Sequence, residues 1–483
     1  MDVNSAKSTT RLEELGYTQQ LERRLHVWHV VGLAMADVSP TMAVVFLSAG
    51  VFSIAGTFAI GIGFIQSFVV VLIALCLAEL ATMFPIAGGM YSLVRNVLPA
   101  PIAWITMFNY LIQGVVIPAS ITLGIAAFVK DLIPGLHLAD KPLALILLVA
   151  ATAIALCTVR VGAWVTVVMV SVELIVLGIV TVAALAHPHQ NLAHVTFHPT
   201  LLHGAGLAGV AFGAMLASIV AQFNVNNGYD AALGFSEELM GDERSVAKAV
   251  VTSAVLAGVL IMIPLIAAIV AAPSLPAFFK APAPVVYSVQ QGLGSSASKI
   301  VDFGASIALF NSMLALLMYF GRGVYTTGRD GIWPPPISRA FATLNRFRAP
   351  AAGVLVLAVP AAVLIFLSAL NFLIVFAGTV IAAVYFCIGL AAVWSRVTQK
   401  DIRRPYKMPL WPLPPLIVVI FTGVALVKQE GKYLVAELIL IGVSLALWAL
   451  SGLWRAQALE AVAEVTGAVA PAPEVSSDAV VLP

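Results

Sequence analysis

The sequence predicts an all-α integral membrane protein with about twelve transmembrane helices. Of its 483 residues, 61% are hydrophobic and only 10% are charged, whereas soluble globular domains are about half apolar and a quarter charged. A membrane-spanning helix takes about 20 apolar residues, so roughly a dozen spans with their loops use the whole chain. This length leaves no room for a separate soluble catalytic domain.

Hydropathy and helix-breaking residues define the predicted spans and the tails that flank them. The spans cover 27–52, 57–83, 101–129, 142–160, 163–186, 205–236, 246–271, 298–321, 350–368, 371–395, 411–428 and 433–455. Residues 1–26 form a polar tail before the first span. The second tail, residues 456–483, is rich in Ala, Val, Glu and Pro, and we expect it to be disordered from about Gly467.

Basic residues are distributed unevenly between the two sides of these spans. Six of the 25 basic residues lie in loops on one side and all six are lysines, while every arginine lies on the other side. Because basic residues concentrate in cytoplasmic loops, we predict a multi-pass protein of the cell membrane with both termini in the cytoplasm. The net charge of +2 gives no nucleic-acid-binding footprint.

Two predicted spans are interrupted near their middle by polar or helix-breaking residues. The interruptions are MADVSP at residues 35–40 and QFNVNNG at residues 222–228. Backbone groups without hydrogen-bond partners are not tolerated in a bilayer. Such breaks therefore occur only where they are buried in protein or line a water-filled cavity. Breaks five spans apart indicate two inverted repeats, 27–190 and 205–396, with a binding site near the membrane midplane. Residues 411–455 are then two peripheral helices.

Four motifs occur in order along the chain. They are Ala78-Glu79-Leu80 with Phe84-Pro85 and Gly88-Gly89-Met90-Tyr91; Asn227-Gly228-Tyr229-Asp230 with Ser236-Glu237-Glu238 and Arg244; Gly321-Arg322-Gly323-Val324-Tyr325 with Gly328-Arg329-Asp330-Gly331-Ile332-Trp333-Pro334; and Arg404-Pro405-Tyr406-Lys407. Over about residues 25–455 the chain resembles the amino acid–polyamine–organocation (APC) superfamily of transporters.

The resemblance to this superfamily implies a fold and an activity. The fold is a five-plus-five inverted repeat of the leucine-transporter type, with helices 1 and 6 broken. The activity is secondary active transport of an amino acid or related amine by alternating access, coupled to protons or working by exchange. The alternatives are a carrier of polyamines, amino alcohols or ω-amino acids and, less favoured, a sodium-coupled carrier or a channel.

The first break places Asp37 at membrane depth. An intramembrane carboxylate costs several kcal/mol unless it is paired or solvated, and such residues generally face a pathway. We therefore predict that Asp37 binds a substrate ammonium or a coupling cation. The alternative is that Asp37 caps the N–H groups of the second half-helix, with help from Ser39 and Pro40. Most members of the superfamily have glycines in the first break, where they let the backbone approach a substrate carboxylate. The first break of this chain contains no glycine, which argues against such close binding.

The second break supplies amide side chains and a glycine that permits the chain to turn. We predict that both breaks, with one residue of the third span, line the substrate site: Ala36, Asp37, Val38, Ser39, Gln113, Phe223, Asn224, Asn226, Asn227 and Gly228. Ordinary helix packing is the alternative role for Phe223, and an interhelical hydrogen bond is the alternative for Gln113. Asp230 is assigned the capping of the resumed half-helix.

Glu173 lies near the middle of the fifth span, which contains no basic residue. By resemblance it aligns with a position where some proton-coupled members of the superfamily carry a titratable lysine. Desolvation favours the protonated form of a carboxyl, so Glu173 is predicted to carry the coupled proton. The alternative is a hydrogen bond that ties the fifth helix to the first. Asn311 and Ser312 in the eighth span leave open a sodium site built from oxygen ligands.

Catalytic signatures are missing from the sequence. It contains no H-E-x-x-H, no G-x-S-x-G, no Walker-type glycine loop and no haem-attachment cysteine pair. We therefore expect a protein that is not an enzyme and that uses no cofactor or bound metal. Five of the eight histidines fall in one predicted outside loop, but their spacing gives no compact zinc signature.

Overall fold

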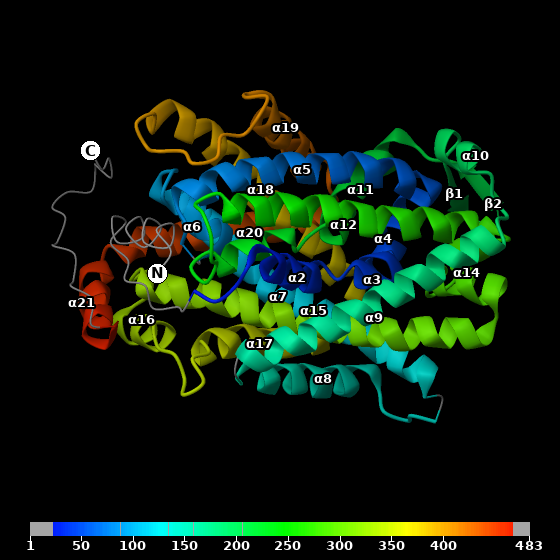
Figure 1. Ribbon diagram of the computed structural model, residues 1–483, viewed down its shortest axis with the longest axis horizontal. Helices are drawn as coiled ribbons and strands as arrows, with labels where there is room; N and C mark the ends of the chain where they lie inside the picture. Colours follow the sequence, from blue (N-terminus) through cyan, green and yellow to red (C-terminus); the bar gives the residue numbers. More distant parts are fainter. Residues whose placement is uncertain (1–22, 87, 134, 158, 205, 467–483) are drawn as a thin grey trace.

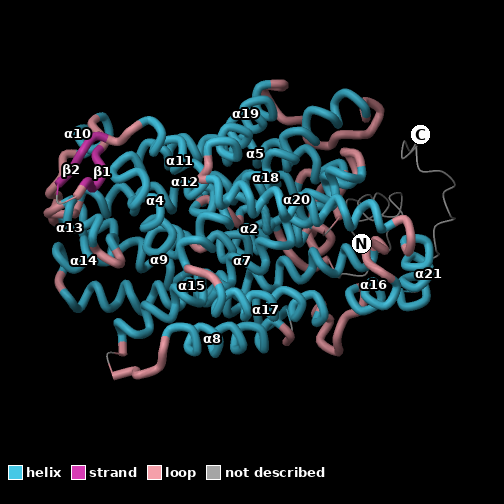
Figure 2. Tube along the Cα trace, turned by 180° about the vertical axis from the view of Figure 1, so that it is seen from behind, coloured by secondary structure: helices cyan, strands magenta, loops and turns pink. Residues whose placement is uncertain are grey.

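The computed structural model describes residues 23–466 except residues 87, 134, 158 and 205. This part of the chain forms a bundle of long helices, most of which run roughly along the longest axis of the molecule (Figure 1). One end of the bundle carries α16 and α21, and the other carries α10 and a small β-hairpin. Viewed from behind, α8 and α17 lie along one edge of the bundle (Figure 2).

The elements of the first half of the chain are mainly helical. They are α2 (Val27–Val38), α3 (Pro40–Met42), the π-helix η1 (Ala43–Leu47), α4 (Ser48–Ala55), the 3-10 helix η2 (Gly56–Phe58), α5 (Ala59–Met83), α6 (Gly89–Arg95), α7 (Ala100–Leu132), α8 (Asp140–Ala155), α9 (Val159–Ala186), α10 (Leu192–Phe197), β1 (Thr200–His203), β2 (Gly206–Gly209), α11 (Phe212–Val225) and the 3-10 helix η3 (Tyr229–Phe235).

The second half continues with helices alone in its described residues. They are α12 (Ser245–Val270), α13 (Leu275–Lys280), α14 (Pro284–Leu293), α15 (Ser295–Arg329), α16 (Pro335–Phe341), α17 (Ala351–Leu367), α18 (Leu370–Thr398), α19 (Leu413–Lys428), α20 (Gly431–Ser451) and α21 (Arg455–Thr466).

The helices support a membrane protein. Within the described residues, seven helical stretches are long and apolar enough to cross a membrane, and α17 and α19 are shorter apolar helices. α18 is enclosed by other helices, because 89% of its most apolar stretch is buried inside the protein. Only 17% of the corresponding stretch of α20 is buried. Each of the twelve predicted spans contains helical structure. The number of spans that cross the membrane and the inverted repeat remain predictions.

The expectation that the protein is all-α is wrong in one place. β1 and β2 pair in an antiparallel hairpin, with Thr200 opposite Gly209, in a region that the sequence analysis assigned to a loop and to the start of the sixth span. Gly204 adopts a φ of 61° beside the turn, and the sixth helix begins only at Phe212. The hairpin is attached to the bundle because Thr200 N donates to Thr57 Oγ1 at 2.9 Å.

The second tail begins with a helix, α21, which ends at Thr466, before the segment expected to be disordered. α21 packs on α16, where Arg339 and Glu464 form an ion pair. Just before α21, Trp454 Nε1 donates to the Ile332 carbonyl at 3.1 Å. These contacts give the residues up to Thr466 a tertiary partner that hydropathy could not reveal. The expected disorder from Gly467 onward, and most of the first tail, lie outside the described residues.

Candidate functional site

The first break lies at Ser39, between α2 and α3. Ser39 adopts a left-handed conformation with φ 40° and ψ 80°, and α3 begins with Pro40. The Ser39 side chain accepts from Met42 N at 3.4 Å and so caps the second half-helix. Ser39, and not Asp37, occupies the N-cap position.

The second break touches the first. α11 ends at Val225, Gly228 adopts a φ of 107°, and the chain resumes as the 3-10 helix η3. A Cβ on Gly228 would lie 2.6 Å from Val38 N and 2.8 Å from the carbonyl carbon of Asp37. Both the backbone conformation and the close approach require glycine at this position. The breaks that the sequence placed five spans apart therefore meet inside the bundle.

Two buried carboxyl groups lie at this meeting point. Asp37 is 3% exposed, and its Oδ1 has no hydrogen-bond partner in the described part of the chain. Asp230 is 2% exposed and accepts from the Tyr319 hydroxyl at 3.0 Å, while its Oδ1 also has no partner. Gly228 is the N-cap of η3, so Asp230 does not take the capping position expected for it. Neither carboxyl forms an ion pair with a described basic residue. The meeting point therefore holds two buried carboxyl groups, neither of which has a described basic partner.

Four buried tyrosines surround the breaks, and sequence reasoning missed all of them. The rings of Tyr110 and Tyr319 are 5.8 Å apart, and those of Tyr229 and Tyr385 are 6.1 Å apart, measured between centroids. The Tyr385 hydroxyl donates to Asn227 Oδ1 at 3.0 Å. A tyrosine in the middle of an apolar span carries a hydroxyl that usually needs a polar partner. That requirement is the sequence signal that could have identified them.

The predicted amide side chains of the second break bind neighbouring helices. Asn224 Nδ2 donates to the Ile374 carbonyl in α18 at 3.1 Å. Asn226 accepts from Gln222 Nε2 at 2.7 Å and donates to Ser67 Oγ in α5 at 3.4 Å. These bonds hold the broken helix in place. They also occupy side-chain amide groups that were predicted to line the site.

Two other predicted lining residues pack within the scaffold. Phe223 is fully buried, with its ring centroid 5.8 Å from that of Tyr385 and 5.9 Å from that of Phe421. Gln113 is also buried and donates to the Asn109 carbonyl of its own helix, α7, at 3.2 Å. Helix packing, the alternative role given for Phe223, describes its contacts. The Gln113 bond stays within α7 and so differs from the interhelical bond given as its alternative.

Glu173 in α9 binds the first break directly. Its Oε2 accepts from Ser39 Oγ at 2.9 Å and from Thr41 N at 3.4 Å. Thr41 Oγ1 donates in turn to the Glu173 carbonyl at 3.1 Å, and Glu173 Oε1 has no hydrogen-bond partner among the described groups. The fifth helix is therefore tied to the first, as the structural alternative expected. The role of Glu173 in coupling remains a prediction.

The N–H groups that begin α3 are already occupied. Pro40 has no N–H, Thr41 N donates to Glu173, and Met42 N donates to Ser39 Oγ. Ala43 N donates to the Ser39 carbonyl at 3.0 Å. A helix N-terminus attracts anions through such free donors, and here the Glu173 carboxyl takes the place that a substrate carboxylate would take.

The eighth-span residues also reach the first break. Ser312 Oγ donates to the Asp37 carbonyl at 3.0 Å, and Ser39 Oγ lies 3.4 Å from the Ala308 carbonyl. Both polar atoms of the buried Asn311 side chain lack a hydrogen-bond partner in the described structure. α15 therefore brings oxygen atoms to the same region as Asp37 and Glu173.

The motifs that carry the family resemblance meet at the end of the bundle where α2 begins. Arg244 Nε donates to the Pro405 carbonyl at 2.8 Å, which joins the second motif to the fourth. Three ion pairs join the others: Glu79 with Arg404 at 3.1 Å, Glu237 with Arg329 at 3.2 Å, and Glu238 with Arg322 at 3.3 Å. Glu79 also pairs with Arg396 of α18 at 2.6 Å. These contacts join helix ends and loops at this end of the molecule.

A bundle of apolar helices in which two broken helices meet around buried, unpaired carboxyls is the architecture of a membrane transporter. Comparison with known families agrees, because the model of the amino acid permease family matches residues 25–445. The chain belongs to this family, whose members are transporters and not enzymes.

Individual relatives are distant but cover most of the chain. A branched-chain amino acid permease of Lactococcus lactis is 23% identical over 71% of this chain and 76% of its own length. A branched-chain amino acid permease of Bacillus subtilis is 22% identical over 78% of this chain and 83% of its own length. A methylthioribose transporter of Bacillus subtilis is 22% identical over 77% of this chain and 82% of its own length.

Proposed function

We propose that this protein is a secondary active transporter that binds the positively charged amino group of its substrate at Asp37. The observation that carries the proposal is the buried Asp37 carboxyl, which lacks a basic partner and lies at the contact of the two breaks. Asp37 also lies in the last turn of α2, where the helix dipole is negative and favours a cation. Asp230 adds a second carboxyl to the same region.

The substrate is an amino acid or a related amine. The relatives are named for branched-chain amino acids and for methylthioribose, so the family supports an amino acid substrate. The occupied donors at the start of α3 favour a substrate that does not place a carboxylate there. A polyamine, an amino alcohol or an ω-amino acid meets this condition, because its charged amino group has no carboxylate next to it.

Glu173 is the group that we assign to proton coupling. Its carboxyl accepts hydrogen bonds from Ser39 and Thr41 at the first break, so a change in its protonation would act on the helix that carries Asp37. The competing proposal is a sodium ion bound by Asn311, Ser312 and the carbonyls of the break. Exchange of one substrate for another is compatible with either coupling ion.

The proposed transport cycle fits a multi-pass protein of the cell membrane. We propose twelve spans, a five-plus-five inverted repeat and cytoplasmic termini. The end of the bundle with the motif ion pairs is then the inner end. Alternating access would open these ion pairs when the breaks release substrate to the cytoplasm.

A ligand panel on the purified protein tests the proposed substrate class. A ligand that binds the folded state raises its apparent stability, by about 2.7 kcal/mol at 100 times the Kd. We expect stabilisation by at least one compound with a primary amino group among leucine, putrescine, ethanolamine and 4-aminobutyrate. Asp37→Asn should remove this stabilisation. Stabilisation by methylthioribose alone, unchanged in Asp37→Asn, contradicts the amino-group site.

Transport by the reconstituted protein distinguishes a carrier from a channel. Vesicles with an imposed proton or sodium gradient should accumulate the stabilising compound above its external concentration, because a coupled carrier uses one gradient to build another. A flux that only dissipates the substrate gradient, with no accumulation under either ion gradient, would indicate a channel.

A further inference from the structure

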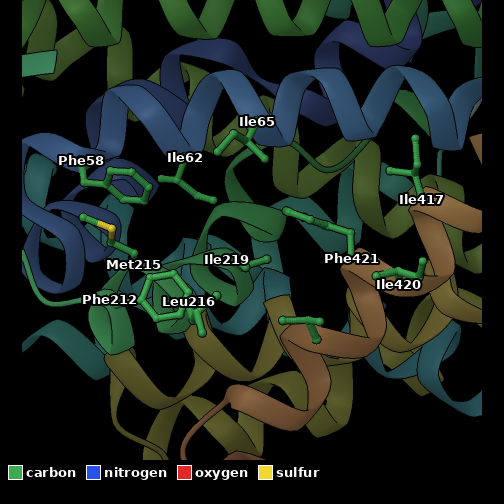
Figure 3. Close-up of a pocket in the computed structure, with 11 residues that line it drawn as sticks. Phe58, Ile62, Ile65, Phe212, Met215, Leu216, Ile219, Ile417, Ile420 and Phe421 are labelled. Carbon is green, nitrogen blue, oxygen red and sulfur yellow. The ribbon is translucent and has the colours of Figure 1, made fainter. Parts of the chain in front are cut away.

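An apolar cavity opens on the side of the bundle between α5, α11 and α19 (Figure 3). Its volume is about 400 Å³. Every side chain that lines it is apolar: Phe58, Ile62, Ile65, Phe212, Met215, Leu216, Ile219, Ile417, Ile420, Phe421 and Val424. We call these eleven residues the lateral groove.

The lateral groove opens toward the surface that the bilayer covers. Phe212 is 73% exposed and Ile420 is 66% exposed, although both are large apolar side chains on apolar helices. The groove runs from Phe58 and Phe212, near the hairpin end of the bundle, along α5 to Ile417 on α19 (Figure 3). Its long direction follows α5, and therefore the direction in which lipid chains lie in a bilayer.

The groove is also in contact with the second break. Phe421 lines the groove, and its ring centroid is 5.9 Å from that of Phe223 in α11. Phe223 packs on Tyr385, whose hydroxyl donates to Asn227. An occupant that supports Phe421 would therefore support the packing that fixes the broken helix.

We propose that the lateral groove binds one acyl chain of a membrane phospholipid and that the bound chain stabilises the conformation described here. A lining without charged or polar side chains matches a hydrocarbon chain and offers nothing to a headgroup, which would stay at the membrane surface beyond Phe58 and Phe212. The groove is continuous with the lipid-covered face of the spanning helices, so the bilayer itself supplies this ligand. The bound chain fills space that would otherwise leave Phe421 without packing partners on one side.

Photocrosslinking in lipid nanodiscs tests the site. The probe is phosphatidylglycerol with a diazirine on one acyl chain, and adducts are mapped by peptide mass spectrometry. We expect adducts to concentrate on the groove segments of α11 and α19. Ile420→Trp, which covers the opening, should reduce these adducts about tenfold, equivalent to about 1.4 kcal/mol of binding free energy. Val359→Trp on α17 is the matched control, because Val359 is 62% exposed but lies outside the groove, and it should leave them unchanged.

The effect on stability gives an independent readout. Addition of the unlabelled phospholipid to the detergent-purified protein should raise the melting temperature of the wild type and of Val359→Trp, but not that of Ile420→Trp. Adducts spread over all exposed apolar faces, or adducts on the groove that Ile420→Trp does not reduce, overturn the proposal. An equal melting-temperature rise in all three proteins overturns the stabilising role.

A second copy of this chain is the competing occupant. Ile420→Cys in a Cys157→Ser background tests it, because Cys157 is exposed while Cys76 and Cys387 are buried. Disulfide-linked dimers through residue 420 in nanodiscs would assign the groove to a protein interface and overturn the lipid site. A monomer that keeps its phospholipid adducts supports the acyl-chain site.

Discussion

The two helix breaks differ in how they satisfy their own polar groups. At the first break, Ser39 and Glu173 bind the backbone of the second half-helix, and the Asp37 carboxyl lacks an ion-pair partner among the described residues. At the second break, the side chains of Asn224 and Asn226 bind α18 and α5, and Gly228 allows the backbone to touch the first break.

We propose that this difference divides the work of binding between the two breaks. The Asp37 carboxyl of the first break has no described basic partner, so it would recognise a cationic substrate. The amide side chains of the second break bind neighbouring helices and fix the position of the broken helix. The second break would therefore determine the shape of the proposed site and contribute less to its charge. A mutation at the second break should therefore act first on folding, and a mutation at Asp37 should act first on substrate affinity.

The largest effect is expected from Gly228→Ala. The added Cβ would meet the Val38 backbone at 2.6 Å in a residue with a φ of 107°, and strained backbone alone costs about 1–3 kcal/mol. We expect a loss of stability above about 2 kcal/mol and a loss of transport. Gly213→Ala in α11, the helix before the second break, is the control, because nothing lies within 4 Å of its Cβ position. Equal thermal stability and uptake of the two variants would show that the breaks do not touch in the working protein.

Asp37→Asn should act on binding and leave folding intact. The asparagine keeps the size of the side chain but removes the charge that attracts an ammonium, so the Kd for an amine substrate should rise at least tenfold, or about 1.4 kcal/mol. Isothermal titration of the purified protein measures this change. Asp242→Asn in the loop before α12 is the control and should bind as the wild type does. An unchanged Kd in Asp37→Asn would remove Asp37 from the site.

Glu173→Gln should separate exchange from proton-driven accumulation. Glutamine can accept the hydrogen bonds of Ser39 and Thr41 but cannot release a proton, so the first break should keep its shape. We expect labelled substrate to exchange for unlabelled substrate at near the wild-type rate, while accumulation driven by an inward proton gradient in sodium-free proteoliposomes is lost. If the wild type requires sodium and ignores the proton gradient, coupling belongs to Asn311 and Ser312 instead.

The smallest effect is expected from Tyr385→Phe. This change removes the hydroxyl that donates to Asn227 at 3.0 Å, and one buried hydrogen bond contributes about 1 kcal/mol. Thermal unfolding should report a loss of that size, with a Kd that changes less than in Asp37→Asn. Tyr287→Phe serves as the control, because Tyr287 lies in α14, outside both helix breaks. A Kd change as large as that of Asp37→Asn would make Tyr385 part of the recognition site.

The sequence by itself determined the class of the protein and the positions of the breaks. Long apolar runs must be helical in a bilayer, because only a helix satisfies its own backbone there. A polar interruption such as Asp37-Val38-Ser39-Pro40 can be recognised in the sequence for the same reason, because it interrupts a run that must otherwise be helical. The need of Glu79 for a basic partner is also visible in the sequence, since a buried carboxylate at the end of a span requires a basic residue nearby; Arg396 and Arg404 meet this need.

The tertiary structure decided which polar groups are occupied and which remain available. Hydropathy treats Asn224, Asn226 and Asp37 alike, because all are polar residues at membrane depth. Their different roles depend on distances to residues more than 100 positions away, such as Ile374 for Asn224 and Ser67 for Asn226. The tyrosines, the hairpin and the lateral groove depend equally on neighbours that are distant in the chain. Local pattern fixes where a helix breaks, whereas packing fixes what the broken ends can bind.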